Sequence, residues 1–248
     1  MTPDPLSILI IFAALAMGGT LKGATGAGAP VIAVPVMAAF FDVRIAVMLM
    51  AAPNLVTNTW QCRAYWRHVQ NRRFAIRFAL AGGAGAIVGT VLLAVMPIRA
   101  LTIIVAAAVM AYVGLRLIQP EFRLEARTSD RLAVPVGTLG GILQGAGGIS
   151  APFSISFLNA MRLERKAFIG TVSVYFIAMA VTQLPTLFAT GLMTPGLLAL
   201  SALALIPLVL FMPVGAWAAR WLTPQGFDRL TLVLLFLLAL RLLYVAFR

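Results

Sequence analysis

The chain has 248 residues, of which 62% are hydrophobic and 10% charged, and its mean hydropathy is +1.00. Soluble domains are closer to half apolar and a quarter charged, so this composition excludes a soluble globular enzyme and a disordered chain. The apolar runs are hydrophobic on every face. They therefore predict a polytopic all-α membrane protein rather than a β-barrel, whose strands alternate in polarity.

The net charge is +12, from 19 Lys and Arg against 7 Asp and Glu. Basic residues collect in the cytoplasmic loops of membrane proteins, and no aromatic-basic motif indicates RNA binding, so we expect a lipid bilayer and no nucleic acid as partner. The single cysteine, Cys62, excludes an internal disulfide and a CxxC metal site. Residues 1–4 lack the basic start of a cleavable signal peptide.

Ten apolar runs follow one another along the chain. They cover residues 6–21, 29–41, 45–61, 74–96, 100–118, 132–146, 151–161, 167–189, 196–219 and 230–247. Four of them are short and form two pairs, each joined by a glycine-rich break: 6–21 with 29–41, and 132–146 with 151–161. Helices of this length reach about 20–24 Å, less than the ~30 Å hydrocarbon core. We expect each pair to be short helices, either re-entrant or spanning.

An internal repeat divides the chain. Segment 18–30 (GGTLKGATGAGAP) matches segment 140–152 (GGILQGAGGISAP) at eight of thirteen positions. The same offset of 122 residues aligns Asp42 with Glu164, Arg44 with Lys166, and Gln61 with Gln183. We therefore predict an N-terminal repeat over 1–119, a cytoplasmic linker over 120–131 and a C-terminal repeat over 132–248.

The two halves are expected to have inverted topology, because three or five crossings per half are both odd numbers. The loop at 62–77 carries five arginines, whereas its counterpart at 190–195 carries no charge. Conversely, the region around Arg44 has one basic residue, whereas its counterpart at 162–166 has three. Since basic loops face the cytoplasm, this alternation agrees with inversion and places both termini outside the cytoplasm.

Inverted repeats with interrupted helices are typical of transporters, which bind their substrate near the membrane midplane. Helix N-termini carry unsatisfied N–H groups that attract anions, and each glycine-rich break precedes an Ala-Pro helix start. We expect backbone at four glycines to approach a substrate closely, namely Gly26, Gly28, Gly147 and Gly148, with Ser150 as an N-cap. The alternative is that these glycines only allow close helix packing.

Polar side chains within apolar runs complete the predicted binding site. Lys22, beside Thr25, is either a cation in the anion pathway or a lysine that snorkels to the interface; its counterpart Gln144 is neutral. Asn54, Asn58 and Gln61 fall on one helical face, which is expected to point inward. The candidates in the second half are Ser173, Tyr175, Thr182 and Gln183. The alternative role for all of these is hydrogen bonding between helices.

The seven acids all lie in loops or at segment ends: Asp4, Asp42, Glu121, Glu125, Asp130, Glu164 and Asp228. Cation carriers and proton relays commonly use a carboxylate inside the membrane, so we expect no metal site, no cofactor and an anionic substrate. Export of an anion is favoured by a membrane that is negative inside, at about 2.3 kcal/mol per charge per 100 mV. This suggests a uniport.

The paired motifs at 22–30 (KGATGAGAP) and 144–152 (QGAGGISAP) resemble those of the sulfite exporter TauE/SafE family of bacterial membrane proteins. The resemblance covers nearly the whole chain. It implies export of sulfite, or of an organosulfonate such as sulfoacetate, across the inner membrane. An enzyme is not expected, because no His, Cys or carboxylate cluster falls inside the membrane. An anion channel, a partner-dependent membrane subunit and a carrier of uncharged or cationic substrates remain alternatives, and the oligomeric state is open.

Overall fold

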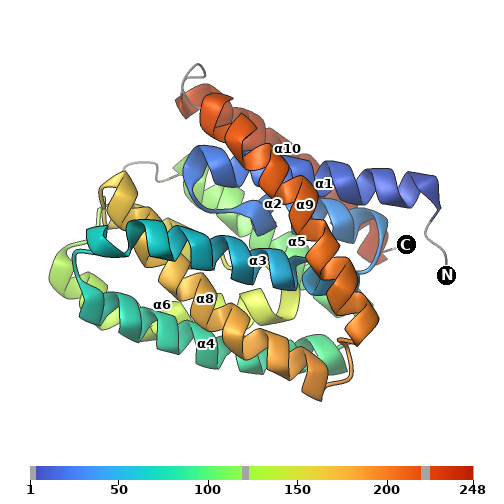
Figure 1. Cartoon of the computed structure of the whole chain (residues 1–248), viewed down its shortest axis with the longest axis horizontal. Coiled ribbons are helices and arrows are strands. Elements are labelled where there is room, and N and C mark those ends of the chain that lie inside the picture. Colours follow the sequence, from blue (N-terminus) through green and yellow to red (C-terminus); the bar gives the residue numbers. More distant parts are fainter. Residues whose placement is uncertain (1–3, 119–122, 219–223, 248) are drawn as a thin grey trace.

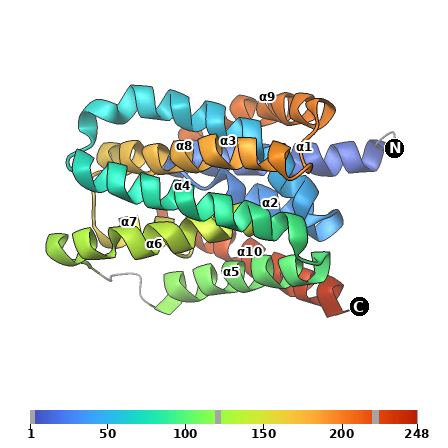
Figure 2. The same ribbon diagram turned by 90° about the horizontal axis from the view of Figure 1, so that it is seen from below.

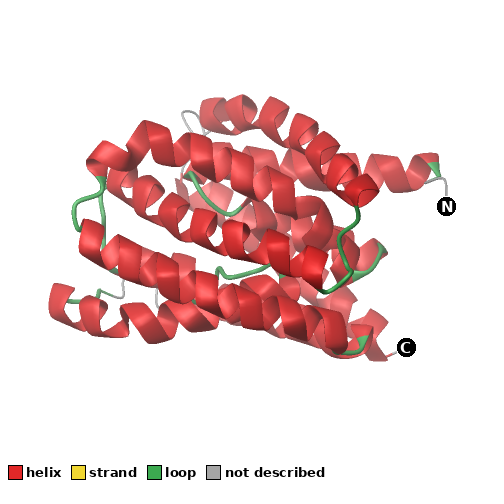
Figure 3. Cartoon of the chain, turned by 60° about the horizontal axis from the view of Figure 1, so that its bottom comes forward, coloured by secondary structure: helices red, strands yellow, loops and turns green. Residues whose placement is uncertain are grey.

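A computed structural model describes residues 4–118, 123–218 and 224–247, without the side chains of 224–230 (Figure 1). Within these ranges the chain forms ten α-helices and one short 3-10 helix, and Figure 3 shows helix nearly throughout. The helices are α1 (Pro5–Thr25), α2 (Ala29–Phe40), α3 (Val43–Tyr65), η1 (Trp66–His68), α4 (Arg72–Val95), α5 (Ile98–Ile118), α6 (Ala126–Gly147), α7 (Ser154–Ala160), α8 (Arg165–Ala189), α9 (Pro195–Ala218) and α10 (Pro224–Phe247). The prediction of an all-α architecture is confirmed.

Five of these helices are long and apolar enough to cross a membrane, namely α1, α4, α5, α8 and α9. Helix α3 is also long, at 23 residues, but its apolar run is interrupted by the asparagines and glutamine of its inward face. Of the predicted linker, 119–122 lie outside the described residues, and α6 already begins at Ala126.

The prediction that all four members of the paired runs are short is wrong for the first member of each pair. Helix α1 has 21 residues and α6 has 22, whereas α2 has 12 and α7 has 7. The hydropathy pattern ended the first apolar run before Lys22 and began the sixth after Arg131. Both helices continue through these charged residues, because a cation inside a helix interrupts the apolar run without breaking the backbone hydrogen bonds.

Local sequence explains where the helices begin and end. Asp4 caps α1 by accepting a hydrogen bond from the Ser7 amide at 3.0 Å, and Asn71 caps α4 by accepting one from the Phe74 amide at 3.0 Å. At the other end of α1, Gly26 adopts a left-handed conformation with φ of 83°. A residue with a Cβ resists this conformation, so glycine fixes the point at which α1 stops.

The long helices form a bundle in which chain neighbours run antiparallel (Figures 1 and 2). The connections after α3 and after α7 lie at one end, and the start of α1 and the end of α10 lie at the other (Figure 1). The first end carries the arginines of 62–77 together with Arg162, Arg165 and Lys166. We call it the basic end.

The two halves of the chain interlock. The first helix of each half packs against the fourth helix of the other half: α1 against α9, and α6 against α4. Helix α3 packs against its counterpart α8, and α5 against its counterpart α10. The core is therefore shared, and neither half buries its apolar residues alone.

Glycines make these contacts close. A Cβ at Gly19 or Gly23 of α1 would collide with the backbone of α9, at Leu208 and Met212 respectively. In the same way a Cβ at Gly141 or Gly145 of α6 would collide with the backbone of α4. Helices pack at such short range only where side chains are absent, so packing accounts for four glycines of the repeated motif.

Candidate functional site

The first glycine-rich turn joins α1 to α2 and has the predicted backbone. Gly26 and Gly28 adopt φ of 83° and 93°, and α2 begins at Ala29 with Pro30 in its first turn. A Cβ at Gly26 would collide with the side chain of Ile169 on α8, whereas Gly28 has more room. The turn is thus held against the other half of the chain at Gly26.

The second glycine-rich turn starts in the same way and then differs. Gly148 adopts φ of 70° after α6, but α7 begins only at Ser154, with no side-chain cap. The prediction of Ser150 as an N-cap is therefore wrong. Ser150 instead precedes a separate turn, and its Oγ accepts a hydrogen bond from Ser154 Oγ at 2.9 Å.

Two of the four predicted glycine amides are already bonded within the protein. The Gly26 amide donates to the Lys22 carbonyl at 2.7 Å, and the Gly148 amide donates to the Gln144 carbonyl at 2.8 Å. Each bond satisfies the last turn of its own helix. Gly147 and Gly148 face apolar side chains, the former Val105 and the latter Val34 and Val47.

Lys22 is the charged group of the bundle interior. Its side chain is 1% exposed, and its Nζ donates a hydrogen bond to Asn58 Oδ1 at 2.9 Å. Asn58 Nδ2 in turn donates to Asn54 Oδ1 at 3.0 Å and to the Asn54 carbonyl at 2.7 Å. The snorkelling alternative for Lys22 is therefore wrong, because the ammonium points into α3 and not toward the membrane surface.

The inward polar face predicted for α3 is confirmed. Asn54, Asn58 and Gln61 are all at most 5% exposed. The side-chain oxygens of Gln61 and Gln144 are buried without a hydrogen-bond partner, and Gln183 Nε2 donates to the Gln144 carbonyl at 3.4 Å. A buried amide oxygen without a donor is unfavourable, so both oxygens are suited to accept a hydrogen bond from a guest molecule or water.

The remaining candidates of the second half bond to the backbone. Ser173 Oγ donates to the Ile169 carbonyl at 2.7 Å, and Thr182 Oγ1 lies 3.0 Å from the Gly83 carbonyl. Tyr175 is fully buried, donates its hydroxyl to the Gly137 carbonyl at 2.8 Å, and stacks on Phe78 at 4.1 Å between ring centroids. These contacts assign Tyr175 to the packing of α4, α6 and α8.

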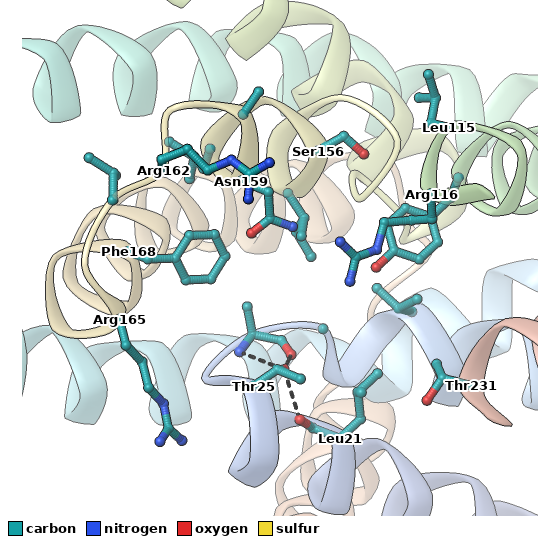
Figure 4. Close-up of a pocket in the computed structure, with 18 residues that line it drawn as sticks. Leu21, Thr25, Leu115, Arg116, Ser156, Asn159, Arg162, Arg165, Phe168 and Thr231 are labelled. Atoms are coloured by element: carbon teal, nitrogen blue, oxygen red, sulfur yellow. Dashed lines mark hydrogen bonds between the residues drawn. The ribbon is translucent and has the colours of Figure 1, made fainter. Parts of the chain in front are cut away.

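A cavity of about 580 Å³ opens between the first glycine turn, α5 and the region from α7 to the start of α8 (Figure 4). Its polar lining includes three arginines, and we call it the arginine cavity. The lining residues are Leu21, Thr25, Ala27, Gly28, Val31, Tyr112, Leu115, Arg116, Ile155, Ser156, Leu158, Asn159, Ala160, Arg162, Leu163, Arg165, Phe168 and Thr231. It takes its lining from the first glycine turn and not from 145–150, so the two turns do not share it.

The sequence patterns do not single out the arginines of this cavity. Arg116 ends an apolar helix, and Arg162 and Arg165 lie in a basic loop, where the positive-inside rule already explains them. The equivalent positions in the other half, 122 residues away, hold Leu238, Phe40 and Val43. The internal repeat therefore does not single out these arginines either. Only the tertiary structure brings α5 beside the α7–α8 connection.

No group of three or more His, Cys, Asp or Glu gathers in the described part of the chain. No curated protein and no solved structure matches the chain. The family model described as sulfite exporter TauE/SafE matches residues 10–242. With this match over nearly its full length, the chain belongs to the sulfite exporter TauE/SafE family of membrane transporters.

Proposed function

We propose that this protein exports a small oxyanion, sulfite or an organosulfonate such as sulfoacetate, across the bacterial inner membrane. We further propose that Lys22 binds the anion inside the bundle. The observation that carries the proposal is the burial of Lys22, which is 1% exposed with an amide oxygen as its hydrogen-bond partner. The described acids cap or flank helix ends, as Asp4, Asp42 and Glu125 do.

A buried ammonium group is costly unless a negative charge compensates it. Asn58 neutralises none of that charge and accepts one of the three ammonium hydrogens. An oxyanion would supply the missing charge and accept the other hydrogens. The partnerless oxygens of Gln61 and Gln144 would help to distinguish a substrate that carries a hydroxyl from one that does not.

The contacts between halves support inverted repeats related by a two-fold axis. Gly26 packs against Ile169, and Gly148 packs against Val47. Gly148 lies 122 residues after Gly26, and Ile169 lies 122 residues after Val47, so the second contact is the first with the two halves exchanged. The contacts of Gly23 with Met212 and of Gly145 with Thr90 are exchanged in the same way. Rocking of such repeats about a shared site would expose Lys22 first to one side of the membrane and then to the other.

The orientation follows from charge. The basic end would face the cytoplasm, and the arginine cavity, with Arg162 and Arg165 in its lining, would then be the route by which the anion enters. Helix α2 is about 18 Å long and α7 about 10 Å, too short to cross the membrane. Each of these short helices would follow its glycine turn inside the membrane and lead the chain back to the side from which it came. Each half would then cross the membrane three times.

The proposal is tested by uptake of labelled sulfite into inside-out vesicles with an imposed voltage. Lys22→Gln, which installs the residue type of position 144, is expected to lower the flux at least about tenfold, since a charge-assisted hydrogen bond is lost. The matched control is Lys166→Gln, which removes a lysine from the basic end outside the bundle interior. Both variants must elute as folded protein.

Wild-type flux in the Lys22→Gln variant would contradict the site. A flux that does not change with voltage but requires a pH gradient would contradict a uniport mechanism. Saturation with sulfite concentration is expected of a carrier, whereas single-channel currents without saturation would instead support the alternative of an anion channel.

A further inference from the structure

The arginine cavity lies on a different side of α1 from Lys22. Leu21, Thr25 and Gly28 of the α1–α2 turn line it, whereas the Lys22 side chain points to Asn58 on α3. The wall between them is therefore the last turn of α1. A guest in the cavity would not touch the Lys22 ammonium in this conformation.

Both halves of the chain contribute a cation to this cavity. Arg116 comes from α5 and Arg162 from the connection between α7 and α8. Figure 4 shows the two guanidinium groups pointing toward the space between them, with Asn159 beside Arg162. The third arginine, Arg165, donates a hydrogen bond from its Nη2 to the Ala24 carbonyl at 3.0 Å. It ties α8 to the end of α1 at the edge of the cavity.

The described lining residues of the cavity include no carboxylate. Guanidinium groups bind sulfonate, sulfite and carboxylate oxygens through paired N–H donors. Asn159 adds a neutral amide donor at the same site, whereas the Ser156 hydroxyl donates to the Ala151 carbonyl at 3.4 Å. The volume of about 580 Å³ lies within the range of small-molecule sites, and Val31, Ile155 and Phe168 offer apolar contacts to the carbon skeleton of an organic anion.

We propose that the arginine cavity is a second anion-binding site, in which Arg116 and Arg162 hold an oxyanion head group between the two halves of the protein. This inference rests on the proposed function for its substrate class, since it adds a site ahead of Lys22 on the same route. One protein chain then binds two anions at once, one in the cavity and one at Lys22.

The test is the stoichiometry of binding of methanesulfonate, a stable monoanion, to the purified full chain by equilibrium dialysis. Wild type is expected to bind two equivalents. Arg116→Gln and Arg162→Gln are each expected to bind one, or to weaken one of the two sites at least about tenfold. Arg67→Gln, at the basic end but outside the cavity lining, is the matched control and keeps two.

Lys22→Gln separates this inference from the proposed function. If wild type binds one equivalent that only Lys22→Gln removes, the cavity site is overturned and the proposed function stands. If wild type binds one equivalent that only the arginine variants remove, the proposed Lys22 site is contradicted instead. Arg116→Lys keeps the charge and is the control for loss of fold. It should retain more affinity for methanesulfonate than Arg116→Gln, and equal losses of affinity in both variants would overturn the role of charge.

Discussion

The two glycine-rich turns begin alike and end in different surroundings. Both follow a long helix that stops at a left-handed glycine, Gly26 or Gly148. The first then enters α2 directly and borders the arginine cavity, whereas the second passes through an extra turn and packs under Val34 and Val47. The repeat thus preserves backbone and packing in both halves, while the buried cation and the cavity belong to the first turn alone.

This difference explains why only part of the motif is symmetric. The glycines at the second and sixth positions of both copies contact the backbone of a helix from the other half, namely Gly19 and Gly23 in the first copy and Gly141 and Gly145 in the second. This geometric need is the same on both sides. The residue four positions before the left-handed glycine has no such constraint. It is Lys22 in one copy and Gln144 in the other.

The largest expected effect is on folding, and it tests the symmetric part. Gly23→Ala and Gly145→Ala each place a Cβ against the backbone of a neighbouring helix, at Met212 and Ala86 respectively. We expect both to lower the free energy of unfolding by at least about 1–3 kcal/mol through overpacking. The measurement is thermal unfolding in detergent.

Gly114→Ala is the control for this pair, because nothing lies within 4 Å of the added Cβ. It should leave stability unchanged or raise it, since alanine is the better helix former. If only one of the two motif variants were destabilised, the packing of the halves would not be equivalent.

The second effect is on transport, and it tests the asymmetric part. In the double variant Lys22→Gln with Gln144→Lys the cation moves to the other half. We expect the flux to remain at least about tenfold below wild type, because Asn58 is the hydrogen-bond partner of position 22 and position 144 does not line the arginine cavity. Recovery of sulfite flux in vesicles would show that the halves are interchangeable in binding.

The smallest effect separates packing from binding within the second half. Tyr175→Phe removes the hydroxyl that donates to the Gly137 carbonyl but keeps the ring on Phe78. We expect a loss of about 1 kcal/mol in stability and an unchanged Michaelis constant for sulfite. A raised Michaelis constant with normal stability would instead support a role for Tyr175 in substrate binding.

Much of the fold could be read from the sequence. Ten apolar runs became ten helices in the described part of the chain, because a backbone in lipid must satisfy its own hydrogen bonds. The helix start at Ala29 and the inward face of Asn54, Asn58 and Gln61 followed from proline placement and helical periodicity. The lengths of α1 and α6 did not, because hydropathy detects the end of an apolar run rather than the end of a helix.

The sequence by itself determined the class of protein, the repeat offset and the inward face of Asn54, Asn58 and Gln61, since composition, self-similarity and helical periodicity are local or internal properties of the chain. Only the tertiary structure decided that the amides of Gly26 and Gly148 bond to their own helices, that the Tyr175 hydroxyl bonds to the Gly137 carbonyl, and that Arg116 and Arg162 line one cavity. These facts depend on which distant helices lie side by side. Apolar helices in lipid can pack in many ways that the same hydropathy pattern would allow.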